Sequence, residues 1–393
     1  MPQNNVMPAL NIVFIASPGP FYGEETLRTN VLQVLKPIAD EIFVITGNFP
    51  SSVSPDYKLH IRNIRYDNEK GSILTKVARH IALQFKIAYY LITVPRRFNI
   101  AIFYCAQTYL PAMMLAKLLK LKTINVATGT TSRLEMPNRY KIILSTINRV
   151  LERINYTLAD RIVMESEAFI AFMNFGKYKR KIVVNGGRYI DTSLFEKRKS
   201  IRNRRYLAGY IGRLALGKGI MNFIKAIPLI QREHSGANFL IGGDGPLLQI
   251  VRGEIESRAF SDKVEVPGWI SHDKDLTSYF NELKLLVLAS YSEGLPAIVQ
   301  EAMACGVVVL ATPVGGIPDL VKDGKTGFIL QDDSSECIAR NIIRVSEHPD
   351  LEEISQNARG LIEKEYAFNI ISEKWKHLLI ELVLGKQKKA DAC

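Results

Sequence analysis

The stretch Ser290–Gly316, SYSEGLPAIVQEAMACGVVVLATPVGG, decides the fold of this protein. It follows an apolar run, Leu285–Ala289, that is typical of a buried strand. Pro296 stands where a helix is expected to begin, because the fixed φ of proline suits the first helical position. Gly306 is expected to end that helix, and the apolar run Val307–Ala311 predicts the next buried strand. The stretch therefore predicts a strand, a helix and a second strand.

The start of this helix predicts an anion site between two carboxylates. The first N–H groups of a helix, here those of Ala297 and Ile298, have no acceptor within the helix and attract phosphate together with the helix dipole. Glu293 lies in the loop before the helix and Glu301 lies within it. A nucleotide sugar needs acceptors for the hydroxyls of its two sugars and donors for the diphosphate between them. The alternative is that Glu293 is a loop charge and Glu301 part of a solvated helix face.

The segment SEGLPAIVQEAMACG, with seven residues between Glu293 and Glu301, resembles the signature of the retaining glycosyltransferases of family four. That family adopts the two-domain GT-B fold. Three more segments resemble the family in the same order along the chain: GYIGRLALGKG (Gly209–Gly219), IGGDGP (Ile241–Pro246) and PVGGIPDLVKDGKTGFIL (Pro313–Leu330). The resemblance is close from Val183 to Leu330 and looser before it.

The resemblance implies a role for particular residues. Arg213 and Lys218 would bind the donor diphosphate, the arginine bidentately and the lysine as a point charge. Glu293 would hold hydroxyls of the donor sugar and Glu301 the ribose hydroxyls. Glu293, Arg213 and Lys218 are the expected catalytic residues. The expected donor-binding residues are Gly19, Gly23, Gly212, Arg213, Lys218, Trp269, Glu293, Gly294, Leu295, Ala297, Ile298 and Glu301.

Some of these positions have an alternative interpretation. Trp269 lies where the family holds the nucleotide base, but its ring could equally belong to the core. Gly19 and Gly23 resemble the glycine-rich donor-side loop of the family without its adjacent glycine pair, or they form a plain turn. Many relatives have a histidine near the reacting sugar, and this chain has none at the matching places. Its substitutes would be Thr128, Thr130, Arg133 or Gln107.

Length and composition fit a globular protein of two domains. The chain has 393 residues, 47% hydrophobic and 23% charged, which is more than a single core usually supports. Its four cysteines are scattered without the spacing of a metal site or a disulfide framework, and we expect no metal and no cofactor besides the donor substrate. A signal peptide and a membrane-spanning run are not recognisable, so we expect a cytoplasmic protein.

The charge is unevenly divided along the chain. Residues 1–200 contain 28 Lys and Arg against 14 Asp and Glu, a net charge of +14, whereas the remainder has 23 against 25. This asymmetry predicts an anionic partner for the first half. A nucleic-acid-binding motif is not recognisable, so a membrane surface is favoured over nucleic acid.

The alternation of apolar runs and helical patterns predicts an α/β protein built on doubly wound parallel sheets. The resemblance implies two Rossmann-like domains that face a central cleft: an acceptor-binding domain over 1–196 and a donor-binding domain over 205–365. It also implies a C-terminal helix over 366–393 that returns to the first domain. Strands are expected in the first domain at Asn11–Ala16, Ile42–Thr46, Ile100–Tyr104, Thr123–Ala127, Arg161–Glu165 and Ile182–Val184.

Residues 72–94 predict a long apolar helix with a basic side. Lys76, Arg79, His80 and Gln84 recur at helical spacing, and two more arginines follow at residues 96 and 97. Such a helix is a candidate for lying in a membrane interface. The alternative is a helix packed on the sheet with a solvated basic edge.

The resemblance thus implies a retaining, metal-independent hexosyltransferase that moves a sugar from a UDP- or GDP-sugar to a lipid-linked or cell-surface glycan. It would act in the cytoplasm, peripheral to the inner face of the cell membrane. Two alternatives remain: a nucleotide-sugar epimerase of similar fold, and a non-catalytic protein that binds nucleotide sugars. The base, the sugar, the acceptor, the linkage and the oligomeric state do not follow from the sequence.

Overall fold

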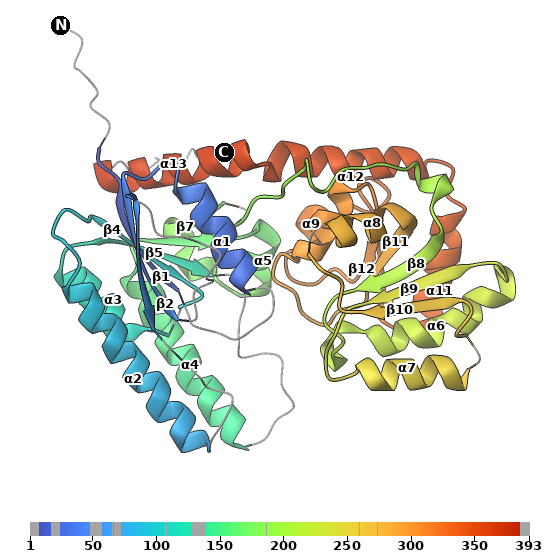
Figure 1. Ribbon diagram of the computed structural model, residues 1–393, viewed down its shortest axis with the longest axis horizontal. Helices are drawn as coiled ribbons and strands as arrows, with labels where there is room; N and C mark the ends of the chain where they lie inside the picture. Colours follow the sequence, from blue (N-terminus) through green and yellow to red (C-terminus); the bar gives the residue numbers. More distant parts are fainter. Residues whose placement is uncertain are drawn as a thin grey trace, which may run out of the picture. The chain divides into compact units, whose positions relative to one another are not determined.

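The computed structural model describes residues 8–16, 24–47, 57–64, 66, 72–106, 108–127, 139–185, 187–258, 260–272 and 274–385. The chain forms two compact units, each built on one parallel sheet (Figure 1). The N-terminal unit comprises Met1–Glu165, Asn174–Tyr189 and Asn369–Cys393, and the C-terminal unit comprises Ser166–Met173 and Ile190–Phe368.

The N-terminal unit has a seven-stranded sheet in the order β3-β2-β1-β4-β5-β6-β7. Every residue of β1 and β4, at its centre, is buried, as expected for parallel strands covered on both faces. Its strands are β1 (Asn11–Ala16), β2 (Glu41–Gly47), β3 (Leu59–Ile64), β4 (Ile100–Tyr104), β5 (Lys122–Ala127), β6 (Arg161–Met164) and β7 (Ile182–Val184). Its helices are α1 (Glu24–Leu35), α2 (Ile73–Ile92), α3 (Leu110–Leu118), α4 (Arg139–Leu158), the 3-10 helix η1 (Gly176–Lys181) and most of α13 (Phe368–Leu384).

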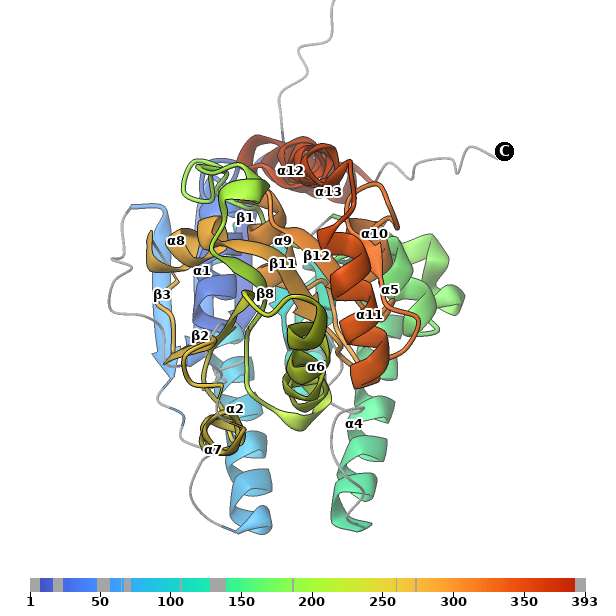
Figure 2. The ribbon, with the colours of Figure 1, turned by 90° about the vertical axis from the view of Figure 1, so that its right-hand side faces the viewer.

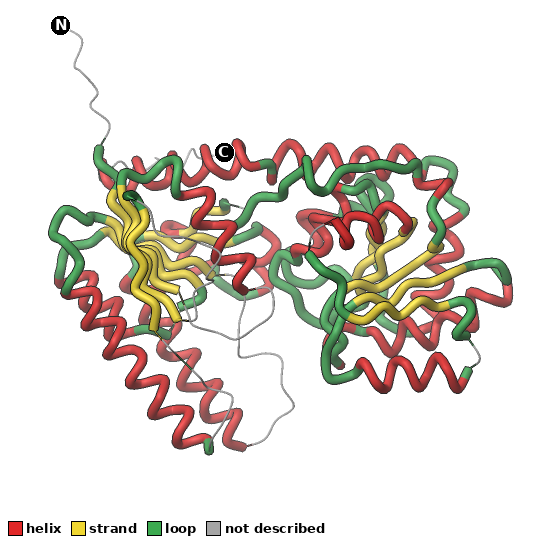
Figure 3. Tube along the Cα trace, viewed as in Figure 1, coloured by secondary structure: helices red, strands yellow, loops and turns green. Residues whose placement is uncertain are grey.

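Two helical layers enclose this sheet. Helices α2, α3 and α4 cover one face, while α1 and the N-terminal unit's part of α13 lie against the other (Figures 1 and 3). Helix α3 packs against both α2 and α4, and it also contacts β5. Helices α2 and α4 extend past the ends of the strands in Figure 3, so part of this layer projects beyond the sheet.

The C-terminal unit has a six-stranded sheet in the order β10-β9-β8-β11-β12-β13. Its central strands β8, β11 and β12 lie side by side (Figure 2). Its strands are β8 (Tyr206–Ile211), β9 (Asn238–Gly242), β10 (Val264–Gly268), β11 (Leu283–Leu288), β12 (Val308–Ala311) and β13 (Phe328–Ile329). Its helices are α5 (Glu167–Phe172), η2 (Ile201–Asn203), η3 (Leu216–Lys218), α6 (Ile220–Glu233), α7 (Leu248–Ser257), α8 (Lys274–Glu282), α9 (Ala297–Ala304), α10 (Ile317–Leu320), α11 (Ser335–Ser346) and α12 (Leu351–Tyr366).

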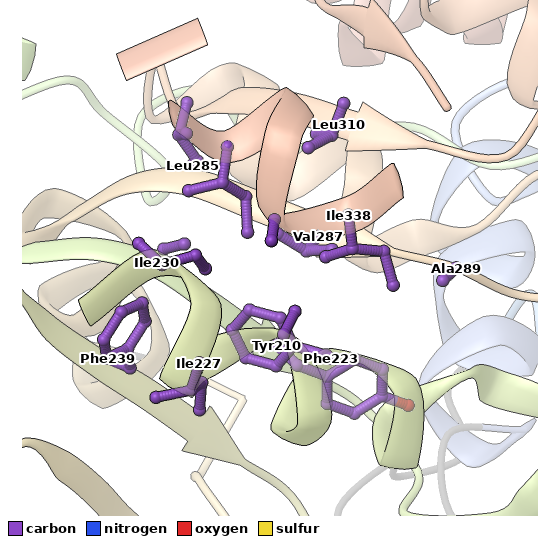
Figure 4. Close-up of a cluster of buried hydrophobic side chains, with 14 of the residues drawn as sticks. Tyr210, Phe223, Ile227, Ile230, Phe239, Leu285, Val287, Ala289, Leu310 and Ile338 are labelled. Carbon is purple, nitrogen blue, oxygen red and sulfur yellow. The ribbon is translucent and has the colours of Figure 1, made fainter. Parts of the chain in front are cut away.

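The core of the C-terminal unit fills the space between its sheet and two helices. Phe223 and Ile227 of α6 and Ile338 of α11 meet strand side chains such as Tyr210 and Val287 (Figure 4). All five are buried. Burial of a large apolar side chain stabilises a fold by about 1.5–3 kcal/mol, so this core fixes the strands whose ends carry the loops discussed below.

The doubly wound α/β fold expected from the sequence is confirmed, and the last helix belongs mainly to the N-terminal unit. Two features differ from expectation. Strand β3, LHIRNI, is not predicted, because it lies at the sheet edge and its exposed polar residues break the apolar run. Residues 166–173, inside the first expected domain, group with the C-terminal unit, where the Asp319 carboxylate accepts the N–H of Ala168 at 3.0 Å.

The side chains expected on the basic side of residues 72–94 are not all exposed on α2. Gln84 is buried, and His80 is half-buried with its ring 5.6 Å from that of Tyr109. The exposed face is instead apolar and includes Ile81 and Phe85. Among the helices that the structure describes, none is both long and apolar enough to cross a membrane.

Candidate functional site

The strand order of the C-terminal sheet reverses between β8 and β11. From β8 the chain proceeds through β9 and β10 in one direction, and from β11 through β12 and β13 in the other. In open parallel sheets ligands bind beyond the carboxyl ends of the strands at such a reversal. The loop after β8 carries Arg213 and Lys218, and the loop after β11 carries Glu293. These loops form the candidate site.

Lys218 and Glu293 form an ion pair at this point. The Lys218 ammonium donates to both carboxylate oxygens of Glu293, at 2.7 and 2.9 Å, across 75 residues of sequence. The side chain of Glu293 is only 9% exposed, whereas that of Lys218 is 29% exposed. An ammonium has three donors, so one N–H of Lys218 remains for a further acceptor. The structure therefore brings together two of the predicted site residues.

Two glycines allow the loops of the site to approach each other. Gly219, with φ +71°, follows Lys218, and a Cβ there would lie 2.1 Å from the carbonyl oxygen of Ala289 at the end of β11. Gly315, with φ +60°, is as tightly placed, since its Cβ would lie 1.8 Å from the carbonyl oxygen of Glu293. Any side chain at either position would push apart the backbone that positions Glu293.

Arg213 lies at the exposed rim of the site. It follows Gly212, whose N–H donates to the carbonyl of Gly242. The hydroxyl of Tyr210 donates to the carbonyl of Arg213 at 2.7 Å and holds the backbone of this loop. Burial, and then the Glu293 carboxylate, raises the pKa of Tyr210 well above its usual value, so the hydroxyl stays protonated. The Arg213 side chain is exposed, free to meet an anion from solvent.

The N-terminus of α9 lies next to Glu293 in the chain. Pro296 is the N-cap residue and the helix begins at Ala297, one residue later than the sequence predicts. The carbonyl of Pro296 accepts the N–H of Val299, while within the described part of the chain the N–H groups of Ala297 and Ile298 have no acceptor. These two N–H groups are available to an anion.

The residues between Glu293 and α9 hold this loop in place. Gly294 accepts the N–H of Gly316 through its carbonyl at 2.7 Å. The side chain of Leu295 is buried. Gly294 and Leu295 therefore fix the backbone on which Glu293 stands.

Glu301 is buried in α9 and paired with His272. The carboxylate of Glu301 is 5% exposed, and its Oε1 lies 2.8 Å from Nε2 of His272. The His272 ring lies edge to face with Phe195 at 5.7 Å between centroids. Glu301 thus does not lie on a solvated helix face, and it already has a polar partner.

Trp269, immediately after β10, is 59% exposed. The alternative that its ring belongs to the core is therefore wrong. The ring thus presents a largely exposed aromatic surface at the carboxyl end of a strand.

Several expected residues lie outside the described residues: Gly19, Gly23, Gln107, Thr128, Thr130 and Arg133. Among the described residues, no group of three or more His, Cys, Asp and Glu side chains is arranged to hold a metal ion. Sequence reasoning missed His272, although a histidine three residues after Trp269, just past a strand end, was a usable signal.

Solved structures show the class of fold. The chain resembles a crystal structure of Alr3699/HepE from Anabaena in complex with UDP and glucose, with a TM-score of 0.71. The two are 18% identical, and the match covers 94% of this chain and 99% of that one. The fold is GT-B, as the sequence predicts.

The sequence comparisons place the second half of the chain in a family. Residues 191–361 match the family model described as Glycosyl transferases group 1, and this segment is a domain of that family. The chain is 28% identical over 200 residues to an alpha-D-kanosaminyltransferase of Streptomyces kanamyceticus, which is 49% of this chain and 52% of that protein.

A second relative is named GalNAc-alpha-(1->4)-GalNAc-alpha-(1->3)-diNAcBac-PP-undecaprenol alpha-1,4-N-acetyl-D-galactosaminyltransferase, from Campylobacter jejuni. It is 27% identical over 238 residues, which is 60% of this chain and 64% of that protein. The chain thus spans between half and two thirds of the length of these curated relatives.

Proposed function

We propose that this protein is a retaining glycosyltransferase that transfers a sugar from a UDP- or GDP-sugar to an acceptor hydroxyl. The ion pair of Lys218 with Glu293 carries the proposal, because it places a cation and a hydroxyl acceptor together where the strand order reverses. In a nucleotide sugar the diphosphate is bonded directly to the sugar. A cation for the diphosphate and a carboxylate for the sugar hydroxyls must therefore lie next to each other, as Lys218 and Glu293 do. The Glycosyl transferases group 1 domain supports the same reaction class.

Catalysis would rest on electrostatic stabilisation of the leaving diphosphate. Arg213, the remaining N–H of Lys218, and the N–H groups at the start of α9 would meet the charge that develops there. Glu293 would hold the sugar hydroxyls, and its ion pair with Lys218 would orient the carboxylate. These cations replace a metal in the proposal, so activity should persist when divalent cations are chelated.

Glu301 would bind the ribose hydroxyls. Its carboxylate is paired with His272, and a carboxylate can accept about four hydrogen bonds, so acceptor sites remain for two hydroxyls. Trp269 would border the base. Neither position distinguishes uracil from guanine, and the donor base stays open in the proposal.

The acceptor would be a lipid-linked glycan at the cytoplasmic face of a membrane. The name of the Campylobacter relative includes PP-undecaprenol, and residues 1–200 carry the positive charge that an anionic surface attracts. A water-soluble glycan is the competing acceptor.

Two measurements test the proposed function. Calorimetry with UDP- and GDP-sugars should show binding of one nucleotide class, and Glu293→Gln should weaken the sugar-bearing donor more than the free nucleotide. With an acceptor present, nucleotide release should rise, persist in EDTA, and yield a product whose anomeric configuration by NMR equals that of the donor. Inverted product would reject the retaining mechanism.

The two alternatives give other outcomes. An epimerase would convert the donor sugar with no acceptor present, and chromatography of the nucleotide sugar would show it. A non-catalytic binding protein would bind donor without releasing nucleotide under any condition. Either result would overturn the proposed transfer reaction.

A further inference from the structure

The layer formed by α2, α3 and α4 has an exposed apolar face, here called the three-helix face. On α2 the exposed apolar residues recur every three or four positions, which places them on one side of the helix. Phe85 is 65% exposed and Leu118, on α3, is 77% exposed. The members of the face are Val77, Ile81, Phe85, Tyr89 and Ile92 of α2, Met114 and Leu118 of α3, and Ile147, Val150 and Ile154 of α4.

These side chains belong to one surface. Helix α3 packs against α2 on one side and α4 on the other, and the three helices cover the same face of the sheet (Figure 1). Their buried sides, such as Leu83 and Ile87 of α2, already fill the interior. The exposed side chains are therefore a second apolar surface that the described part of the chain leaves in contact with solvent.

The surroundings of the three-helix face are strongly basic. Residues 70–134 contain ten Lys and Arg and not one Asp or Glu. Within α4 the only acid in the sequence is Glu152, and it is 7% exposed, turned away from solvent. Exposed cations accompany the apolar residues on or beside all three helices: Lys86, Lys120, Arg149 and Arg153.

We propose that the three-helix face docks on an anionic lipid bilayer, with its apolar side chains inserted among the lipids and its cations at the headgroups. An apolar stripe flanked by Lys and Arg is the pattern of a surface that lies in the membrane interface. The positive surroundings complement anionic headgroups. This inference rests on the proposed function for its purpose, which is to bring the N-terminal unit to a lipid-linked acceptor.

A second copy of the chain is a less suitable partner. Two identical faces in a symmetric dimer would bring the same cations together, and the described residues of the face offer no exposed acid to offset them. Helices α2 and α4 also project beyond the strands (Figure 3). A flat fluid surface accommodates such a projection.

Vesicle co-sedimentation tests the proposal with the full chain and without any substrate. Vesicles of phosphatidylcholine alone are compared with vesicles that also contain phosphatidylglycerol, each at low and high salt. We expect binding to the anionic vesicles that falls as salt is raised. The double variant Phe85→Gln and Leu118→Gln should lower the partition coefficient about tenfold or more, because both side chains lose their apolar contact with lipid.

Matched control variants show whether the loss of vesicle binding depends on the three-helix face or follows from the loss of any exposed apolar or basic residue. Ile250→Gln with Leu384→Gln removes two exposed apolar residues elsewhere and should leave binding unchanged. Lys86→Glu with Arg153→Glu should weaken binding most at low salt, whereas Lys225→Glu with Arg232→Glu, exposed on α6, should not. Arg97 is avoided because its guanidinium binds both carboxylate oxygens of Glu41, at 2.8 and 2.7 Å.

Three outcomes would overturn the proposal: no binding to anionic vesicles at low salt, binding that ignores Phe85→Gln with Leu118→Gln, or a dimer in sedimentation velocity that this variant dissolves. The last would assign the face to a second copy. Nucleotide-sugar calorimetry on the same variants keeps the two proposals apart. Vesicle binding without donor binding would reject the proposed function alone, and donor binding without vesicle binding would reject the membrane face alone.

Discussion

Each of the two units is built on its own doubly wound parallel sheet, but the helices that cover the sheets expose different kinds of side chain. The three-helix face of the N-terminal unit exposes ten large apolar side chains. In the described part of the C-terminal unit, helices α6 to α12 expose a single large apolar side chain, that of Ile250. In the C-terminal unit the notable side chains are the paired charges at the strand ends. The same fold therefore presents an apolar, basic surface in one unit and a charged ligand site in the other.

The largest effect should come from the charged site. Arg213→Ala should lower turnover about 100-fold, or about 3 kcal/mol in the transition state, because it removes a cation from the developing diphosphate charge. Arg213 is exposed, so the melting temperature and vesicle binding should not change. The matched control is Lys225→Ala, an exposed cation of α6. Unchanged turnover in Arg213→Ala, or loss of folding, would remove Arg213 from the site.

The next effect concerns the inward side of α4. Burial raises the pKa of Glu152 from 4.5 to about 7, with Arg149 opposing the shift. Where folding raises the pKa of a carboxyl group, the folded protein becomes less stable as the pH rises from the pKa in the unfolded state through the pKa in the folded state. The reason is that a charged carboxylate must then be buried. Glu152→Gln should therefore be more stable than the natural protein at pH 8, by roughly 2 kcal/mol, and equal to it near pH 4.

Denaturant unfolding at the two pH values measures this difference. Glu256→Gln on α7, an exposed acid, is the control and should change stability at neither pH. A Glu152→Gln variant without a pH-dependent gain would mean that Glu152 faces solvent. The face would then carry an acid among its cations, and the contrast between the two units would weaken.

A smaller effect separates the two glutamates of the site. Glu301→Gln should weaken free UDP or GDP and the nucleotide sugar alike, about tenfold, because the ribose is common to both. Glu293→Gln should mainly affect the sugar-bearing donor and turnover. Calorimetry measures the affinity of each variant for free nucleotide and for nucleotide sugar. An equal loss of free-nucleotide affinity in the two variants would show that the roles are not divided in this way.

The smallest effect should come from His272. Its pair with Glu301 is partly exposed, and such pairs contribute about 0.2–1 kcal/mol, so His272→Ala should weaken free nucleotide by up to about fivefold. His272→Gln can still donate to the carboxylate and should restore most of the affinity. A larger loss with no rescue by glutamine would indicate that His272 contacts the nucleotide itself.

Much of the fold and of the donor site could be predicted because their signals are local. Apolar runs such as Leu285–Ala289 indicate buried parallel strands without any knowledge of which strands lie beside them. Gly219 and Gly315 lie where two backbones nearly touch, and only glycine fits there, so glycines in these motifs indicate the close approach. The helix start before Ala297 was predicted to within one residue because proline restricts the backbone by itself.

The sequence by itself thus determined the two parallel sheets, the loops at the strand ends and the excess of positive charge in the first half. Only the tertiary structure decided that Lys218 pairs with Glu293 and that His272 pairs with Glu301, because partners 75 and 29 residues apart meet only when the strands align. It also decided which side of α2 faces solvent. Helix α2 has apolar residues on more than one side, and the packing of α3 against it selects the side that is buried.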